Sequence, residues 1–131
     1  MKQYIFYFLA FLLVKCTQYD NKNIIASDKG RFWDVSKDGE KEFKEPRYTY
    51  CFNSSGSCLY YHYERENGKI SRRLFDYGDV VYPNTWKLKR DTLEIQGFPY
   101  LIKSLARDSM ILQQVGKTDT MILIRSIFEN S

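Results

Sequence analysis

From residue 30 onward, short runs of Val, Ile, Tyr, Phe and Leu alternate with turn signals at nearly regular spacing. β-branched and aromatic residues favour strands, and short strands at such spacing are typical of an all-β sandwich or barrel. No long segment has helical periodicity, so we expect no helix in the core. The predicted strands cover residues 31–36, 46–52, 58–65, 69–76, 84–90, 92–97, 99–105, 109–115 and 120–127.

Tight turns predict that consecutive strands pair antiparallel. Asn67-Gly68 is the strongest hairpin signal, and it pairs Glu66 with Lys69. A turn at Arg90-Asp91 pairs Leu88 with Leu93 and Trp86 with Ile95 in the same way. Most strands then carry one apolar face, which closes most simply into an up-and-down meander barrel because closure removes the sheet edges. A barrel of roughly eight to ten strands can hold one small ligand.

The first residues indicate export. A short positive start precedes an apolar run from Ile5 to Val14, which is too short to span a bilayer as a stable helix and fits a signal peptide. Cys16, directly after this run, resembles the lipobox cysteine of bacterial lipoproteins. The resemblance implies acylation of Cys16, removal of residues 1–15, and a periplasmic or outer-membrane lipoprotein of a Gram-negative bacterium. Ordinary secretion without a lipid and an N-terminal membrane anchor are the alternatives.

Length and charge limit the rest of the organisation. After residues 1–15 the chain is long enough for one domain, with residues 16–29 as a polar flexible tether and residues 30–131 as the barrel domain. The formal net charge of +4 is small and the positive residues are scattered, so we expect no nucleic-acid partner. We expect a monomer that meets the membrane through its N-terminal lipid.

Cys51 and Cys58 flank a turn-rich segment between two predicted strands. An exported chain meets an oxidising compartment, so we predict a disulfide between these residues, with two free thiols as the alternative. If they face each other across the hairpin, Tyr48 lies opposite Tyr61 on the inner side and His62 falls on the outer side.

Two short motifs resemble lipocalins. Gly30-Arg31-Phe32-Trp33 resembles the lipocalin entry motif, and Arg125 resembles the basic residue that covers its tryptophan. Small lipocalin-like lipoproteins of Gram-negative bacteria are more similar, over residues 30–127. The second half of these lipoproteins is similar to Trp86-x-Leu88-x-x-Asp91-Thr92-Leu93-x-Ile95, Tyr100-x-Ile102-x-x-Leu105 and Asp108-Ser109-Met110-x-Leu112. The resemblance implies a tethered, generally non-enzymatic barrel in which Trp33 and Arg125 pack together at the base.

Arg72 alternates with Ile70 and Leu74, so the pattern points it inward, where a guanidinium needs a partner. We therefore predict a site for a small hydrophobic or amphipathic ligand, in which Arg72 meets an acidic group. The alternative is that Arg72 lies at the barrel rim and reaches water. The candidate ligand-binding residues are Tyr48, Tyr50, Tyr61, Tyr63, Arg72, Trp86 and Tyr100.

Motifs for catalysis are lacking, so we expect no enzyme, no metal and no cofactor. The spacing of His62 and Glu64 does not match a known pattern of metal ligands. We interpret Asp76 and Asp79 as turn residues. A second hypothesis is an interaction or inhibitory lipoprotein with a filled barrel, acting through the loops 37–45 and 77–84. An enzyme that uses carboxylates at the barrel mouth is the third.

Overall fold

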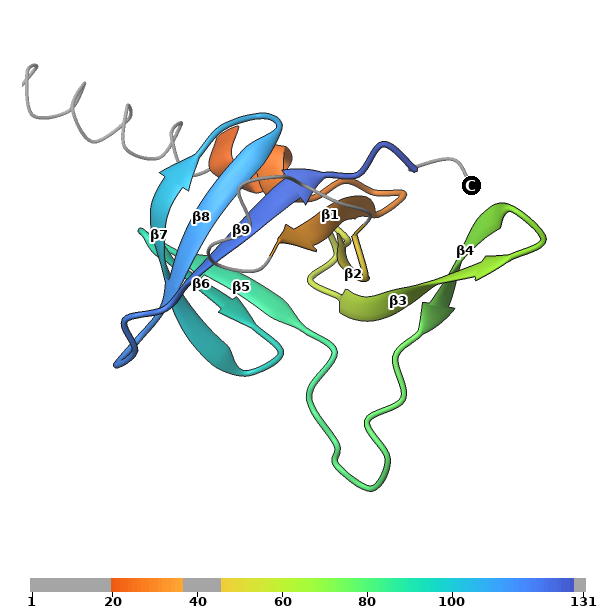
Figure 1. Ribbon diagram of the computed structural model, residues 1–131. Helices are drawn as coiled ribbons and strands as arrows, with labels where there is room; N and C mark the ends of the chain where they lie inside the picture. Colours follow the sequence, from red (N-terminus) through yellow and green to blue (C-terminus); the bar gives the residue numbers. More distant parts are fainter. Residues whose placement is uncertain (1–19, 37–45, 129–131) are drawn as a thin grey trace, which may run out of the picture.

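The computed structural model describes residues 20–36 and 46–128. Within them the chain forms one antiparallel sheet of nine strands and a short helix over residues 20–25 (Figure 1). The strands are β1 (Arg31–Ser36), β2 (Tyr48–Phe52), β3 (Cys58–Glu66), β4 (Lys69–Leu74), β5 (Trp86–Lys89), β6 (Thr92–Ile95), β7 (Phe98–Leu105), β8 (Ser109–Gln114) and β9 (Thr120–Arg125). The all-β prediction is confirmed, and each predicted strand is present.

The sheet is a meander whose two halves meet at β1 and β9. Its strand order is β4-β3-β2-β1-β9-β8-β7-β6-β5, so the first and last strands of the chain pair in the middle, with Trp33 opposite Arg125. The hairpin registers predicted from Asn67-Gly68 and Arg90-Asp91 are confirmed. Asn67 and Gly68 both have positive φ, 51° and 76°, which is the conformation that an Asn-Gly hairpin turn requires.

The sheet is not closed into a barrel, because β4 and β5 lie at its two edges. An isolated bridge between Ser57 and Thr85 joins the segments just before β3 and β5. This bridge lies on the edge of β3 that faces away from β2. From Tyr61 to Glu66, that edge pairs with β4. The loop over residues 75–85 therefore leaves the sheet between the two edge strands (Figure 1).

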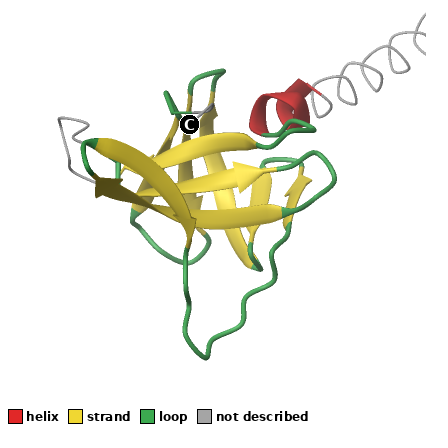
Figure 2. Cartoon of the chain, turned by 90° about the vertical axis from the view of Figure 1, so that its right-hand side faces the viewer, coloured by secondary structure: helices red, strands yellow, loops and turns green. Residues whose placement is uncertain are grey.

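The core covers one face of the sheet and includes the short helix. Ile25 is fully buried, and the indole Nε1 of Trp33 donates a hydrogen bond to its carbonyl oxygen at 2.9 Å. The helix lies at the end of the sheet opposite the loop 75–85 (Figure 2). The buried apolar side chains are Ile25, Ala26, Trp33, Phe52, Cys58, Trp86, Leu93, Ile95, Met110, Leu112 and Leu123.

This packing corrects two predictions. The tether predicted over residues 16–29 is wrong from Asp20 onward, because Ile25 and Ala26 are buried in the core. The expectation of no core helix is also wrong, since residues 20–25 are helical and contribute Ile25. Over the described ranges, no helix has the length and apolar content needed to cross a membrane.

The predicted register of the β2–β3 hairpin is wrong by one residue. Phe52 lies opposite Cys58, and Cys51 lies opposite Leu59. Neighbouring positions on a strand point to opposite faces, so the two cysteine side chains face away from each other. Both are free thiols, and the predicted disulfide is therefore wrong. The turn begins one residue later than predicted, and this places Phe52 in the core.

Candidate functional site

The residues predicted to bind a ligand lie on two opposite faces of the sheet, because the hairpin register differs by one residue. The set on the core face is Tyr48, Tyr50, Trp86 and Tyr100, and the set on the opposite face is Tyr61, Tyr63 and Arg72. The structure therefore separates Arg72 from three of the five tyrosines that were predicted to accompany it: Tyr48, Tyr50 and Tyr100.

Arg72 belongs to a contact network within the chain. Its guanidinium carbon lies 3.7 Å from the ring centroid of Phe32, which is a cation–π contact. Its Nη2 donates to the hydroxyl oxygen of Ser126 at 3.4 Å and to the carbonyl oxygen of Phe128. These contacts join β4 to the end of β9. Arg72 therefore has partners within the chain, and its ligand-binding role stays a prediction.

Asp34 is the acidic member of this network. It is 2% exposed, and it accepts a hydrogen bond from the Tyr63 hydroxyl. The same hydroxyl lies 3.0 Å from Ser126 Oγ. Burial raises the pKa of the Asp34 carboxyl above its ordinary value, while hydrogen bonds and the charge of Arg72 offset part of this rise. The folded state therefore holds the Asp34 proton more tightly than the unfolded chain does.

This difference predicts a pH dependence of stability. As pH rises from the ordinary carboxyl value of 3.8 through the raised pKa, the unfolded chain loses the Asp34 proton first. The contribution of Asp34 to the free energy of unfolding then falls with rising pH. We expect urea denaturation to show the stability of Asp34→Asn improving relative to the native protein across this window. The exposed Asp91→Asn is the control; a difference that is constant or reversed with pH would refute the raised pKa.

The core face continues toward the loop 75–85 as a surface of aromatic side chains, which we name the aromatic surface. Its members are Tyr48, Tyr50, Tyr60, Phe75, Tyr77, Tyr82 and Phe98. The Tyr50 and Tyr60 ring centroids lie 4.5 Å apart, and those of Tyr48 and Tyr60 lie 5.5 Å apart in a stacked arrangement. Phe98 is 40% exposed, and the other members are half-buried.

Burial keeps Tyr50 and Tyr60 of this surface as neutral phenols. Burial raises the pKa of Tyr50 well above its ordinary value, and nearby Tyr100 and Tyr60 add to the rise. The pKa of Tyr60 is raised for the same reasons, burial first and neighbouring tyrosines second. Tyr100 of β7 is thus close enough to affect tyrosines of β2 and β3. These phenols supply hydrogen-bonding hydroxyls beside apolar ring faces.

A polar contact joins Tyr77 to Gln96, in the turn that follows β6. The Tyr77 hydroxyl donates to Gln96 Oε1 at 3.1 Å. Gln96 is 6% exposed, and its Nε2 is buried without a hydrogen-bond partner among the described residues. A buried amide donor without an acceptor is costly.

Sequence reasoning missed Tyr60, Phe75 and Tyr77. The slipped register placed Tyr60 on the polar side of the hairpin, whereas it lies opposite Tyr50. A register set by burying Phe52 would have found Tyr60. Phe75 and Tyr77 follow β4 in an irregular segment, where the alternation of faces gives no guidance.

The remaining predicted positions have simpler outcomes. Arg125 lies over Trp33, with 5.7 Å between its guanidinium carbon and the ring centroid, so the predicted contact is present. Gly78 N–H donates to Asp76 Oδ1 at 2.8 Å, which is the predicted turn. His62 lies opposite Tyr48 on the core side of β3, which corrects its predicted outer position. Its Nε2 lies 2.9 Å from Glu64 Oε1.

Three predicted features lie outside the described residues: the signal peptide over residues 1–15, the lipobox cysteine Cys16 and the loop 37–45. Among residues 20–36 and 46–128, no three His, Cys, Asp or Glu side chains gather as a metal site would need. No family model, curated protein or solved structure matches the chain.

Proposed function

We propose that this protein is an exported, non-enzymatic binding protein whose aromatic surface takes a small amphipathic ligand with a flat apolar body. The observation that carries the proposal is the continuous series of ring contacts from Tyr50 through Tyr60 and Tyr77 to Phe98, which remains partly exposed. Aromatic faces bind flat apolar groups, and the tyrosine hydroxyls supply hydrogen bonds to a polar end.

The partial exposure of these rings supports this assignment. The apolar core of the same face, which includes Trp33, Phe52 and Trp86, is buried by the chain's own side chains. Tyr60 and Tyr77, toward the loop 75–85, are only half-buried. A ligand on these two rings would cover apolar ring surface without displacing the packed core.

The proposal includes a lipocalin-like architecture. The amide of Cys58 donates to the Asn84 carbonyl and the amide of Trp86 donates to the Gly56 carbonyl, both at 3.0 Å. These bonds bring the residues before β5 against the turn before β3. They support a barrel-like arrangement, because they bring the two ends of the open sheet together at this point.

The proposed location is the bacterial cell envelope, with the chain present as a monomer. The apolar run Ile5 to Val14 and the cysteine after it support export and acylation at Cys16. The domain described from Asp20 onward then lies close to the membrane that holds the lipid. A ligand with apolar character is most concentrated there.

A protein partner is the second candidate function. Val81 is 91% exposed and Val80 is 53% exposed, on the loop that leaves the sheet between β4 and β5. Exposed apolar side chains at a loop can insert into a partner's pocket. This role would use residues 77–84 and would not require the rings of Tyr48 and Tyr60.

Titration with the fluorescent probe 1-anilinonaphthalene-8-sulfonate, an amphipathic aromatic anion, tests the proposal. Replacing Tyr60→Leu removes the central ring and keeps an apolar side chain. We expect it to weaken probe binding about three- to tenfold, since an aromatic contact contributes roughly 0.5–1.5 kcal/mol.

Tyr61→Leu is the matched control, because Tyr61 is the next residue of β3 and faces the other side of the sheet. It is expected to leave probe binding unchanged. Equal effects of the two variants, or no probe binding by the native protein, would contradict the proposed site. Val81→Ser tests the loop, and it is expected to affect a partner complex without affecting the probe.

A further inference from the structure

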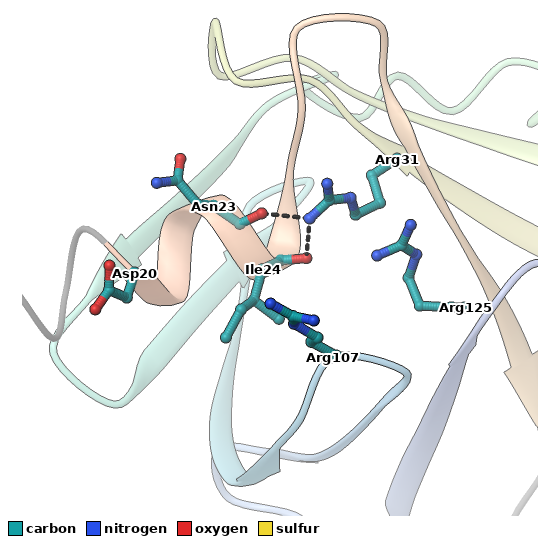
Figure 3. Close-up of a pocket in the computed structure, with 6 residues that line it drawn as sticks. All are labelled: Asp20, Asn23, Ile24, Arg31, Arg107 and Arg125. Carbon is teal, nitrogen blue, oxygen red and sulfur yellow. Dashed lines mark hydrogen bonds between the residues drawn. The ribbon is translucent and has the colours of Figure 1, made fainter.

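Three arginines from distant parts of the chain line a pocket beside the short helix. The pocket has a volume of about 450 Å³ and lies at the opposite end of the molecule from the loop 75–85 (Figures 1 and 3). Its lining residues are Asp20, Asn23, Ile24, Arg31, Arg107 and Arg125. Figure 3 shows the three guanidinium groups directed toward the same space.

Two of these guanidinium groups are fixed by the fold. Arg31 Nη1 donates to the carbonyl oxygen of Ile24 at 2.8 Å and to that of Asn23. Arg125 lies over the indole of Trp33, its partner across the β1–β9 ladder. Arg107, in the turn between β7 and β8, is exposed at the rim. Folding therefore already orders two of the three guanidinium groups, so an anion that binds them causes a smaller loss of side-chain entropy.

The charges of the lining residues favour an anion. The pocket lining contains three arginines and one carboxylate, that of Asp20, which is exposed. Like charges gathered around one space repel each other, and a bound anion relieves that repulsion. The planar guanidinium fork matches the oxygens of phosphate in a bidentate geometry.

We propose that this three-arginine pocket binds a phosphate group. Asp20 follows Cys16 by so few residues that an extended chain spans at most about 14 Å between them. A chain held in a bilayer at Cys16 therefore keeps the pocket within reach of phospholipid head groups. The phosphate of an anionic lipid and a soluble phosphate offer the same chemistry to the arginines. This inference does not depend on the aromatic surface, which lies elsewhere on the molecule.

The test uses the full chain and two probes. Calorimetric titration with inorganic phosphate measures soluble anion binding. Co-sedimentation compares vesicles of pure phosphatidylcholine with equimolar phosphatidylcholine and phosphatidylglycerol, so that binding through the N-terminal segment is present in both samples. Arg107→Gln removes the exposed arginine without disturbing the contacts of Arg31 or Arg125. Arg47→Gln, at an exposed position before β2, makes the same charge change elsewhere.

We expect Arg107→Gln to lower the affinity for inorganic phosphate or for the phosphatidylglycerol vesicles roughly tenfold, because a charge-assisted hydrogen bond is lost. Arg47→Gln is expected to leave both affinities unchanged. Arg107→Lys, which keeps the charge and loses the fork, is expected to restore the affinity only in part. If Arg107→Gln reduces only the additional binding that phosphatidylglycerol gives over pure phosphatidylcholine, the ligand is a lipid head group. If Arg107→Gln weakens phosphate binding in calorimetry, the ligand is a soluble phosphate. Equal behaviour of Arg107→Gln and Arg47→Gln in both arms would overturn the proposal.

Discussion

Replacing Trp33→Ala is expected to lower the free energy of unfolding by about 3–5 kcal/mol, which is typical for deleting a large buried aromatic side chain. Trp33 has no exposed surface, and its indole donates to the carbonyl of Ile25. It also supports the guanidinium of Arg125. The substitution removes core volume, the anchor of the helix and the ring beneath Arg125 in a single change. Chemical denaturation monitored by circular dichroism measures the effect.

Trp33→Phe separates the hydrogen bond from the ring. It keeps an aromatic side chain and leaves the Ile25 carbonyl unsatisfied, at an expected cost of about 1–3 kcal/mol. Amide hydrogen exchange should report faster exchange over residues 20–26 in both variants, because that segment packs on Trp33. A loss below about 1 kcal/mol in Trp33→Ala would show that the indole is not part of the core.

Gly30→Ala is expected to produce the second large loss. Gly30 has φ of +88°, which a residue with a Cβ adopts only with strain. An added Cβ would also lie 2.5 Å from the sulfur of Cys51. Backbone strain and overpacking each cost about 1–3 kcal/mol, so we expect a total loss of at least about 2 kcal/mol in the free energy of unfolding.

Gly68→Ala is the matched control for the backbone term. Gly68 also has positive φ, +76°, but an added Cβ there meets no atom within 4 Å. It should cost less than Gly30→Ala, and the difference measures the contact with Cys51. Adding Cys51→Ala to Gly30→Ala should recover that difference. If the two glycine variants are equally stable, the close approach of Gly30 to Cys51 is refuted.

Sequence reasoning located the strands because their turn signals are local. Asn67-Gly68 determines both the position and the register of its hairpin through the φ angles it allows. The expected single apolar face is present in β8 and β9, where the alternation is clear and Met110 and Leu123 lie opposite each other on the core side.

The β2–β3 hairpin could not be placed by alternation. From Leu59 to Tyr63 every residue of β3 is half-buried, because one side packs on the aromatic surface and the other on the Arg72 network. Aromatic and apolar side chains therefore occur on both sides, and a register chosen to join Cys51 and Cys58 fitted the pattern as well. The residue that decides the register is Phe52, whose burial depends on Trp86 and the rest of the folded core.

The helix over residues 20–25 and the three-arginine pocket depend on contacts between distant segments. One and a half turns are too short to show a helical period, and the surrounding residues are polar. Ile25 becomes a core residue because the folded chain brings it to Trp33 and the other buried apolar side chains. Likewise, Arg31 and Arg107 are ordinary strand and turn residues until the pairing of β1 with β9 brings their segments together.

Native mass spectrometry of the protein purified from its own host shows whether the aromatic surface holds a ligand. We expect a reproducible added mass of a small molecule that is lost on denaturation, which distinguishes it from a covalent lipid. The fraction of protein that carries the added mass should be unchanged in Tyr61→Leu and lower in Tyr60→Leu, because that variant is expected to bind about three- to tenfold more weakly. A protein that carries no added mass, or equal fractions in both variants, would contradict the claim that the aromatic surface is a ligand site.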